Sequence, residues 1–367
     1  MEEIDRLLGK SEFSHEDLVF LLGSMEGDRK ALFAKAKAVK AEYVGNKVYF
    51  RGLIEYSNYC KKNCYYCGIR AGNSRYARYC MTDEEVLEAA MYAYDNNYAS
   101  IVIQSGEQTN KRFISKIESI LKQIHERTSG KMHVTLSLGE QSEETYLRWR
   151  TAGAHRYLLR IEVSNPDLYR KLHPDNKGHD YERRLEALRT LRKTGYQVGT
   201  GVMIGLPWQT LSDLADDLLF FRDFDIDMAG MGPYIEHTDT PLYRFRDQLM
   251  PLKERFDLAL KMVALLRIMM KDINIAATTA MQTIDPQGRE KALLVGANVI
   301  MPNLTPVKYR QDYLLYENKP CLDEEAEECK SCLEARIHMA GDTIGYGEWG
   351  DSKHYGQRSR NTQTNPS

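Results

Sequence analysis

The feature that most constrains the fold is a regular alternation of short apolar runs with longer amphipathic segments, which begins near residue 49. This alternation is typical of parallel strands joined by helices. Eight apolar runs follow one another, at residues 49–56, 99–104, 132–137, 156–160, 198–204, 228–231, 273–277 and 298–301. Eight βα units are enough to close a barrel. An open doubly wound sheet is the alternative, but the glycine-rich turn typical of that fold does not follow the first run.

Further segments flank this repeating region of the 367-residue chain. Residues 1–47 predict a helical extension, in which Ser14 is an expected N-cap. The barrel is expected over residues 48–304, and a C-terminal closing segment over residues 305–351. The tail at residues 352–367 is polar and lacks apolar periodicity, so we expect it to be disordered.

Charge and cysteine content argue against several classes of protein. A formal net charge of -2 offers no basic surface for nucleic acid or for an anionic membrane. No apolar run is long enough for a membrane helix, and the acidic beginning differs from a signal peptide. Seven cysteines, an odd number, indicate metal chemistry in a reducing compartment rather than a disulfide framework. We therefore expect a cytoplasmic protein, with a monomer as the default.

A loop with three cysteines, Cys60, Cys64 and Cys67, follows the first apolar run. One interpretation is a structural zinc site completed by a thiol or imidazole from elsewhere. The other is a [4Fe–4S] cluster, in which three cysteines leave the fourth iron free to bind a ligand that is not protein. The spacing, with an aromatic residue before the last cysteine, resembles the signature of the radical S-adenosylmethionine (SAM) superfamily. That resemblance implies that SAM chelates the free iron and is cleaved to a 5′-deoxyadenosyl radical.

Polar motifs follow most of the other apolar runs, at the point where each predicted strand ends. They lie at residues 104–107, 135–140, 160–162, 205–207, 278–281 and 301–303. Each motif alone is weak, because Ser-Gly-Glu is usually a turn and Arg-x-Glu is more often a surface ion pair. In a βα barrel, however, the carboxyl ends of all strands meet at one end, where active sites lie. Together with the cysteine loop, these motifs predict an active site at that end.

The span from about residue 13 to residue 350 resembles the HydE family, the radical SAM maturases of [FeFe]-hydrogenase, and more distantly methylornithine synthase (PylB) and biotin synthase. The segments that carry this resemblance are Gly52–Cys60, Ile103–Glu107, Thr135–Glu140, Arg156–Arg160, Met203–Pro207, His237–Leu242, Ala277–Met281 and Ala297–Asn303. The resemblance implies a complete (βα)8 TIM-type barrel of the radical SAM superfamily. It also implies that SAM lies over the open iron and the substrate deeper in the cavity.

The resemblance implies roles for individual residues as well. Glu162 and the Gln104–Glu107 segment would hold the amino group of SAM, and Arg184 would bind its carboxylate. The residues expected at the cofactor are Gln104, Ser105, Gly106, Glu107, Glu162, Arg184 and Met203. A polar patch suited to an anionic group, and two tyrosines that close the cavity, would face the substrate; these residues are Arg160, Thr135, Thr278, Thr279, Tyr313 and Tyr316. Met228 and Met301 are further candidates for the cavity wall, although core packing is the favoured interpretation.

A second group of thiols, Cys321, Cys329 and Cys332, follows the eighth run. Three thiols without an obvious fourth ligand allow another iron–sulfur cluster. Their spacing resembles the accessory cluster site of part of the HydE family, which the reaction does not require and which methylornithine synthase is not expected to carry. A zinc site or three idle thiols is the alternative. Cys80 stands where the family usually has arginine, and we interpret it as a small buried thiol.

Three residues depart from the family pattern near the expected site. Ile161 stands where histidine is common, Trp208 where glycine is usual and Leu304 where tryptophan is usual. None of them removes a cluster ligand or a SAM-binding residue, but Ile161 alters a position next to the cavity and so bears on the identity of the substrate. Some histidines could serve as ligands or bases, although structural roles are at least as frequent; they include His155, His173 and His237.

The sequence therefore predicts a radical SAM enzyme with a [4Fe–4S] cluster and SAM as cofactors, and a second iron–sulfur cluster as a further candidate. The resemblance implies that the adenosyl radical acts on an organometallic iron–cysteine precursor during assembly of the hydrogenase H-cluster. The partners that it implies are an electron donor such as ferredoxin or flavodoxin, and the other hydrogenase maturases.

Two other classes of function stay open at this point. A radical mutase acting on a small amino acid, as in methylornithine synthase, should need an acidic partner for the amine of its substrate. A non-catalytic iron–sulfur protein would have no reason to keep Arg160, Glu162 and Arg184 together at a barrel mouth.

Overall fold

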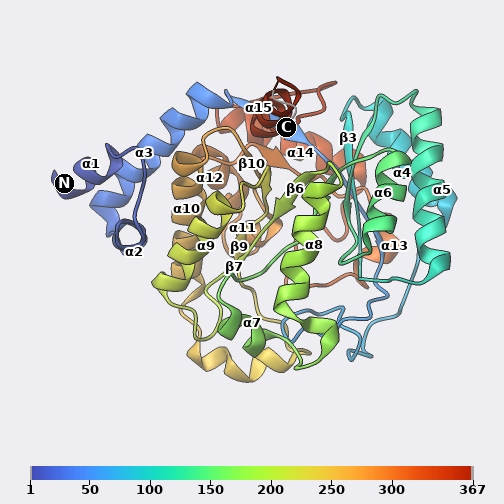
Figure 1. The fold of residues 1–367 in the computed structure, drawn as a ribbon, viewed down its shortest axis with the longest axis horizontal. Helices are drawn as coiled ribbons and strands as arrows, with labels where there is room; N and C mark the ends of the chain where they lie inside the picture. The colour runs from blue at the N-terminus through green and yellow to red at the C-terminus, as the bar shows by residue number, and fades with distance from the viewer. Residues whose placement is uncertain (1, 365–367) are drawn as a thin grey trace.

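A parallel sheet of seven strands lies at the centre of the computed structural model, which describes residues 2–364 (Figure 1). The strand order is β10-β8-β6-β5-β4-β3-β2, and every neighbouring pair is parallel. The strands are β2 (Gly52–Ser57), β3 (Ser100–Ser105), β4 (His133–Ser137), β5 (Ala154–Leu158), β6 (Gln197–Thr200), β8 (Met228–Ala229) and β10 (Asn274–Ile275). The predicted parallel α/β fold is thus confirmed.

The eighth apolar run forms a strand that lies next to both the first and the seventh. It belongs to a small sheet whose members are β11 (Val299–Ile300), β1 (Lys47–Phe50) and β12 (Thr343–Ile344). Strand β1 continues into β2 across Arg51 alone. Val299 pairs with Tyr49 of β1, and it also bridges to Ala276 just after β10. A further two-stranded pair joins β7 (Met203–Ile204) to β9 (Gly232–Pro233).

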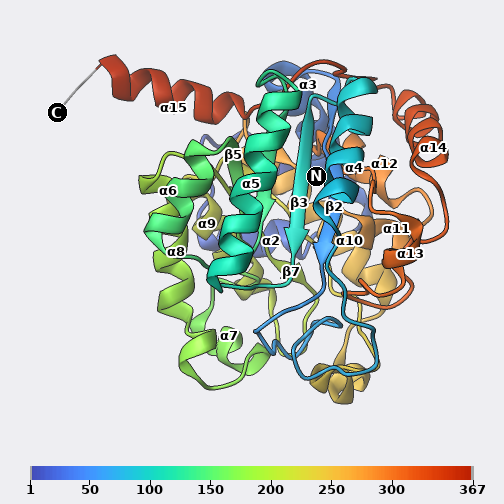
Figure 2. The ribbon, with the colours of Figure 1, turned by 90° about the vertical axis from the view of Figure 1, so that its right-hand side faces the viewer.

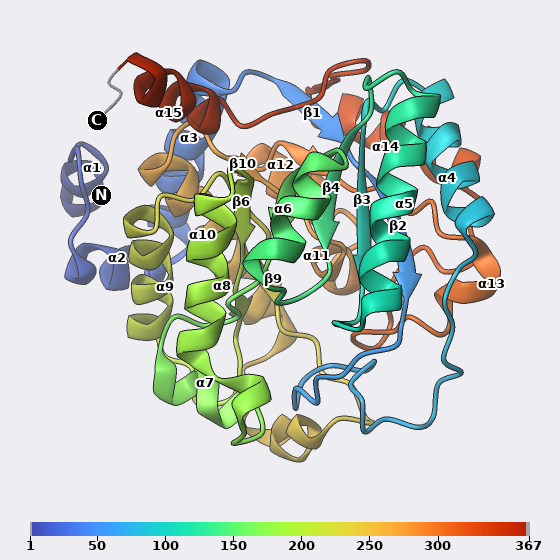
Figure 3. The ribbon, with the colours of Figure 1, turned by 45° about the vertical axis from the view of Figure 1, so that its right-hand side comes forward.

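Helices follow the strands and cover the outer side of the sheet (Figures 2 and 3). The amphipathic segments form α4 (Asp83–Asp95), α5 (Lys111–Arg127), α6 (Glu143–Thr151), α8 (Tyr181–Lys193), α9 (Leu211–Asp223) and α10 (Leu252–Met269). In α5 the buried residues recur three and four positions apart, which places them on the face toward the sheet; they are Phe113, Ile117, Ile120, Leu121 and Ile124. No helix within residues 2–364 has both the length and the apolar character that a membrane crossing needs.

Further helices occupy the loops and were not apparent from the apolar pattern. They are α7 (Pro166–Leu172), α11 (Thr279–Ile284), α12 (Gly288–Leu294), α13 (Val307–Arg310) and α14 (Ala326–Met339), with 3-10 helices η1 (Lys177–His179) and η2 (Pro241–Gln248). Most of these helices span two turns or fewer, so they carry too little periodicity to be recognised in sequence.

Three helices precede the sheet, namely α1 (Glu2–Leu8), α2 (His15–Leu22) and α3 (Glu26–Tyr43). The predicted N-cap is confirmed, because the Ser14 hydroxyl accepts from the Asp17 N–H at 3.2 Å and the Asp17 carboxylate accepts from the Ser14 N–H at 3.0 Å. Helix α2 packs on α9, and α3 packs on α10. The extension therefore lies beside the later helices, at the left of Figure 1.

The C-terminal tail differs from its prediction. Residues 353–364, expected to be disordered, form helix α15 (Lys353–Thr364), and residues 365–367 lie outside the described part of the chain. Ion pairs join two basic residues of this helix to acidic residues in front of β8 and β10; these residues are His354, Arg358, Asp225, Asp227 and Asp272. The prediction considered apolar burial alone, and it was wrong because these charge pairs hold a polar helix against the domain.

Candidate active site

A cavity of about 380 Å³ lies at the carboxyl ends of the strands, beneath the segment that follows β11. Strand ends of β2 to β5 and of β10 contribute to its walls. Most of the residues predicted for the site line this one cavity; they are Cys60, Cys64, Cys67, Gln104, Ser105, Gly106, Glu107, Arg160, Glu162, Arg184, Met203, Thr278, Thr279, Met301, Tyr313, Tyr316, Cys321 and Cys329. The fold thus brings together residues that lie more than two hundred positions apart.

The cysteine loop is held against the cavity by close backbone contacts. The Cys60 Sγ accepts from the N–H groups of Lys62 at 3.4 Å and Glu107 at 3.3 Å. A Cβ on Gly106 would lie 2.4 Å from the Tyr59 oxygen and 2.7 Å from the Cys60 Cβ, so only glycine lets the two loops approach this closely. Backbone donors aimed at a sulfur stabilise its thiolate form.

The three thiols of this loop fit an iron–sulfur cluster better than a single ion. Burial raises the pKa of Cys60, Cys64 and Cys67, that of Cys64 to about 12, and the neighbouring thiols raise it further at Cys64 and Cys67. A bound metal offsets this repulsion, because its charge favours thiolate. The three sulfurs do not all lie within 4.8 Å of one another. Among the described residues, three potential ligand atoms that close together are found in the C-terminal thiol group instead. A wider set of sulfurs suits a cluster of several irons.

A network of buried charges borders the cysteine loop. The Lys62 Nζ lies 3.0 Å from Glu140 and 3.4 Å from Glu107, and the Arg184 Nε lies 2.9 Å from the Glu140 Oε1. The Glu107 Oε2 also accepts from the Glu140 N–H at 2.9 Å. Arg184 is therefore a fixed guanidinium on the cavity wall. Lys62 and Glu140 had no predicted role, although their charges lie in motifs that the sequence analysis had singled out.

Arg160 and Glu162, predicted to contact substrate and SAM respectively, pair with each other. The Arg160 Nε lies 3.0 Å from both carboxylate oxygens of Glu162. Other guanidinium nitrogens of Arg160 donate to the carbonyls of Gly230 at 2.5 Å and Val202 at 2.9 Å. Glu162 has a φ of 70°, a left-handed conformation that places its carboxylate next to the arginine. The Arg-x-Glu motif is thus a cavity ion pair and not a surface one.

The segment after β11 contacts the opposite wall of the cavity. The Gln104 Nε2 donates to the Tyr313 hydroxyl at 3.3 Å, and the hydroxyls of Thr279 and Tyr316 lie 2.7 Å apart. Both predicted tyrosines therefore lie against the strand ends. Burial raises the pKa of the Tyr316 phenol to about 12, so this hydroxyl stays protonated at neutral pH.

A buried ion pair that the sequence analysis missed joins the same segment to the first strand. The Lys319 Nζ lies 2.5 Å from the Glu55 Oε1 and donates to the Tyr313 carbonyl at 3.1 Å. Both charged residues line the cavity. The Glu55 Oε2 is buried without a hydrogen-bond partner among the described residues. Glu55 could have been noticed, because a charged residue is unusual inside an apolar run. No feature of the sequence indicated its partner Lys319.

Several predicted positions need correction. Thr135 does not line the cavity, because it lies two residues deeper in β4 than Ser137, which does. Met301 lines the cavity although core packing was the favoured interpretation, whereas Met228 is buried away from the wall as that interpretation expects, and its Sδ accepts from the Arg51 guanidinium at 2.8 Å. Cys80, predicted to be buried, is exposed. Cys80 forms a β-bridge with Ser57, and its chain neighbours Tyr79 and Met81 both face inward. Because successive side chains of an extended segment point to opposite sides, Cys80 faces outward.

None of the three histidines lines the cavity, and each has a structural partner. His155 stacks on His133 with ring centroids 3.7 Å apart. His173 contacts the Tyr66 hydroxyl at 3.3 Å, and His237 contacts the Tyr76 hydroxyl at 2.8 Å. Burial lowers the pKa of His155 and of His173 to about 3, so both are neutral at physiological pH.

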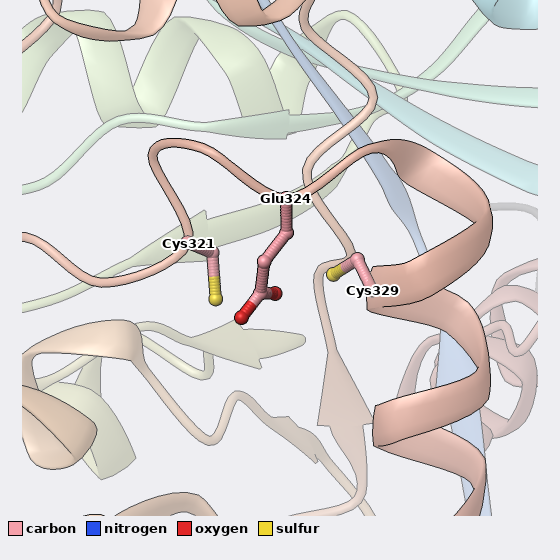
Figure 4. A group of neighbouring side chains, drawn as sticks. All are labelled: Cys321, Glu324 and Cys329. Atoms are coloured by element: carbon pink, nitrogen blue, oxygen red, sulfur yellow. The ribbon is translucent and has the colours of Figure 1, made fainter.

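The second thiol group is only partly assembled. Figure 4 shows Cys321, Glu324 and Cys329 pointing toward one another, and one ligand atom from each lies within 4.8 Å of the others. Cys332 is exposed, and its Sγ accepts from the Arg336 Nε at 3.2 Å. The structure thus brings together two of the three predicted thiols and adds Glu324, which no cysteine pattern could have indicated.

Comparison with known proteins identifies the class to which this site belongs. Residues 54–221 match the family model of the radical SAM superfamily. Two solved structures share the fold over 94% of this chain. They are methylornithine synthase (PylB), with a TM-score of 0.78, 23% identity and 97% of its own chain covered, and the FeFe-hydrogenase maturase HydG from Carboxydothermus hydrogenoformans, with a TM-score of 0.77, 21% identity and 80% covered. The family model and the shared fold point to the radical SAM superfamily, and the curated relative described next shows that the chain is a radical SAM enzyme.

A closer relationship appears among curated relatives. The chain is 47% identical over 352 residues to the [FeFe] hydrogenase maturase subunit HydE of Thermotoga maritima, which covers 96% of this chain and 97% of that protein. Identity to the 3-methylornithine synthase of Methanosarcina barkeri is 27% over 347 residues, with 92% of each chain covered. The chain belongs to the HydE family, and the resemblance inferred from its motifs is confirmed.

Proposed function

We propose that this chain forms an adenosyl radical from SAM and directs it at an organometallic iron–cysteine precursor during assembly of the [FeFe]-hydrogenase H-cluster. The observation that carries the proposal is 47% identity to a HydE protein over nearly the whole chain. A further support is that one cavity connects the cysteine loop with the polar residues of the segment after β11. A radical formed at one end of this cavity would have a direct path within it to a substrate held at the other end.

The cofactor end of the cavity would be organised by the cysteine loop and three strand ends. Cys60, Cys64 and Cys67 would hold the [4Fe–4S] cluster, which when bound supplies the electron that cleaves SAM. The segment Gln104–Glu107, with Glu162 and Met203, would hold the amino group and body of SAM. Arg184 would donate to its carboxylate, because its ion pair with Glu140 already fixes the guanidinium on the wall.

We infer that the strands close into the complete (βα)8 barrel that the family resemblance implies. Strand β11 supports this closure, because the Tyr49 N–H donates to the Asn298 carbonyl at 3.0 Å and the Asn298 N–H donates to the Ile275 carbonyl at 2.9 Å. On this interpretation residues 48–304 form the barrel and residues 305–351 cover its mouth. The Glu55–Lys319 ion pair would then fasten the cover to the first strand.

The substrate would lie between the cofactor and this cover. Arg160, Thr278 and Thr279 offer N–H and O–H donors on one side, and Tyr313 and Tyr316 offer hydroxyls on the other. Donors of this kind suit an anionic group such as the cyanide expected on the precursor. An electron donor such as ferredoxin or flavodoxin would reduce the cluster, and other hydrogenase maturases would supply the precursor and receive the product.

A radical mutase acting on a small amino acid is the second candidate, and one observation favours it. Such an enzyme needs an acidic group for the substrate amine, and the free Oε2 of buried Glu55 could serve. Lys319 already neutralises this carboxylate, however, and identity to 3-methylornithine synthase is only 27%. The hydrogenase role therefore remains the stronger proposal.

The test incubates the cluster-loaded chain with SAM, a reductant and a synthetic iron–cysteine complex that carries carbon monoxide and cyanide. We expect 5′-deoxyadenosine by chromatography and loss of the carbon monoxide and cyanide bands of the complex by infrared spectroscopy. A matched reaction replaces the complex with a mixture of free amino acids. Formation of 3-methylornithine in that reaction, with the iron complex left unchanged, would instead establish the mutase.

A further inference from the structure

A group of aromatic and basic side chains, here called the aromatic patch, lies on the side of the molecule where the parallel strands end. The rings of Trp208 and Phe245 meet edge to face, with centroids 4.5 Å apart. The Lys171 Nζ lies 5.5 Å from the centre of the Trp208 ring, and the Arg244 guanidinium carbon lies 4.6 Å from that of Phe245. These four residues come from α7, from the turn after β7 and from η2, and both helices lie at the lower end of Figure 3. None of the four has a role in the radical reaction.

The backbone at Trp208 is strained. Its φ is 65°, a left-handed conformation that glycine adopts freely and tryptophan rarely does. The Gln209 side chain fixes this turn, because its Oε1 accepts from the Gly205 N–H at 2.7 Å and its Nε2 donates to the Met203 carbonyl at 3.0 Å. Trp208 is nevertheless 36% exposed, so core packing does not account for the strain. A strained residue that presents an aromatic ring to solvent points to a binding role.

Close contacts join the aromatic patch to the cysteine loop. Tyr65 follows Cys64 in that loop; its N–H donates to the Leu172 carbonyl at 2.9 Å, and its carbonyl accepts from the Leu242 N–H at 3.0 Å. Leu172 is the last residue of α7, and Leu242 is the second residue of η2. Tyr65 and Phe245 also pack against one buried group that includes both leucines. A molecule bound to the patch would therefore lie beside the loop that is expected to hold the cluster.

The two cations of the aromatic patch have no acidic partner. No carboxylate lies within 4.0 Å of the charged groups of Lys171 and Arg244 in the part of the chain that the structure describes, and both residues are exposed. The acidic residues of α7 and η2 are Asp167 and Asp247, and each lies beside an arginine of its own helix. The segment 56–81, which carries the cysteine loop, has five basic residues and no acidic one; they are Lys61, Lys62, Arg70, Arg75 and Arg78. This face therefore attracts an acidic molecule.

We propose that the aromatic patch binds an acidic protein of the flavodoxin class, which delivers an electron to the cluster. The proposal rests on the proposed function, because SAM cleavage needs a reduced cluster. A flavodoxin exposes the edge of a planar aromatic flavin among carboxylates, which fits aromatic rings flanked by cations. Redox encounters bury less than about 1,200 Å² of surface, so a few residues can supply much of the contact. Exposed tryptophan and arginine are also the residues that contribute most to binding at protein interfaces.

Electron transfer in this complex needs no further reactant. The anionic flavin hydroquinone loses one electron and becomes the neutral semiquinone. That electron reduces the cluster from [4Fe–4S]²⁺ to [4Fe–4S]⁺, and no proton is transferred. The patch itself takes no part in this chemistry, because its role is to hold the two proteins in contact.

The first test measures binding, so that its result does not depend on activity. The full-length chain with its cluster is titrated with oxidised recombinant flavodoxin by isothermal titration calorimetry. We expect a one-to-one complex that weakens as ionic strength rises from about 0.01 M to about 0.15 M, because the Debye length falls from about 30 Å to about 8 Å. An acidic ferredoxin is titrated in parallel, and we expect flavodoxin to bind more tightly.

Three variants test the residues of the patch. Lys171→Glu combined with Arg244→Glu should weaken flavodoxin binding by at least about tenfold, because like charges then face each other. Trp208→Gly should weaken it by roughly 5–30-fold, which is the range for an aromatic residue at an interface. Glycine suits the left-handed φ, so this variant relieves strain and should fold normally. Lys37→Glu is the matched control, because it makes the same charge change at an exposed position of α3, far from α7 in Figure 3.

A second test measures SAM cleavage with two reductants. Dithionite is a small molecule that needs no docking surface, so all variants should form 5′-deoxyadenosine with it at the wild-type rate. With reduced flavodoxin below saturation, the Trp208→Gly variant and the double variant should be slower than the wild type and the Lys37→Glu control.

Several outcomes would overturn the proposal. Flavodoxin binding that is unchanged in both patch variants would do so, as would an equal loss in Lys37→Glu or tighter binding of the ferredoxin. Loss of dithionite-driven cleavage in both patch variants would show that the patch supports the active site itself. A wild-type chain that forms no 5′-deoxyadenosine with dithionite would count against the proposed function instead, and the binding measurements would still decide whether flavodoxin docks on the patch.

Discussion

The molecule carries two groups of three cysteines at short spacing, and the two groups lie on different kinds of backbone. Cys60, Cys64 and Cys67 lie on a loop without regular secondary structure, directly after β2, and all three line the cavity. In the second group Cys329 and Cys332 lie on α14, and only Cys329 faces inward. A loop lets each thiol turn separately, whereas Cys329 and Cys332 lie three positions apart on one helix, so the rotamers of their side chains decide which of them turns inward. Cysteine spacing therefore indicates a metal site only together with the backbone that carries it.

The largest effect that would test this contrast is loss of SAM cleavage. Changing Cys60, Cys64 and Cys67 to alanine should abolish formation of 5′-deoxyadenosine, because no ligands for the cluster remain. Changing the second group to serine should leave SAM cleavage largely intact. Anaerobic assays with chromatographic detection check both variants. If the second variant still folds but no longer cleaves SAM, that group relays electrons and the contrast fails.

A second difference is that buried charge surrounds the first group. Arg184→Ala should weaken SAM binding by about 1.5–3 kcal/mol, roughly 10–150-fold in Kd, through loss of a charge-assisted contact to the SAM carboxylate. Arg183→Ala is the matched control, because Arg183 is 54% exposed and lies 3.3 Å from the same Glu140. Its effect should be small. Isothermal titration with SAM measures both, and equal Kd values would exclude Arg184 from the SAM site.

Close packing distinguishes the two regions in a third way. Gly106→Ala would place a Cβ 2.4 Å from the Tyr59 oxygen, so the cysteine loop must shift at a cost of about 1–3 kcal/mol. A Cβ added at Gly341, after α14, would meet no atom within 4 Å, so Gly341→Ala costs only the strain of a φ of 80°. We expect cluster content, measured by iron analysis, to fall in the first variant and to persist in the second. Equal iron in both would show that the loop tolerates the shift.

The smallest effect concerns pH and the C-terminal helix. Hydrogen bonds to Asp272 and Asp225 raise the pKa of His354 to about 9. Because this pKa is higher in the folded state than the ordinary value near 6.5, the stabilisation is fully present below about pH 6.5 and is lost as pH rises through about 9. Hydrogen exchange in α15, corrected for the intrinsic pH dependence, should therefore increase over that interval. His354→Gln should remove the pH step, and SAM cleavage should not follow it.

Much of the fold and of the cavity could be predicted from local patterns. The apolar runs placed the strands, because a strand buried in a parallel sheet must be apolar on both faces. The polar residues at their ends then belonged to one site, because all parallel strands of a barrel end on the same side. Gln104, Arg160 and Thr278 were found in this way and do line one cavity. Thr135 was misplaced, because a motif marks a strand end but not the depth of each residue within it.

Contacts between distant segments had no local signal. Lys319 and Glu55 lie 264 positions apart and pair at 2.5 Å. Glu324 joins two cysteines through a loop conformation that precedes a helix, and no spacing rule includes it. His354 and Arg358 order a tail whose composition favours disorder, because their partners lie on loops in front of two strands.

The order of residues alone indicated a parallel α/β fold through its periodicity, a metal-binding loop through its cysteine spacing, and a resemblance to the HydE family through motifs along the chain, which comparison with known proteins confirmed. The tertiary structure decided which charges pair across the cavity, which thiols of the second group meet and how the tail is held. Those outcomes depend on distances between segments that are remote in sequence, and such distances exist only once the chain has packed.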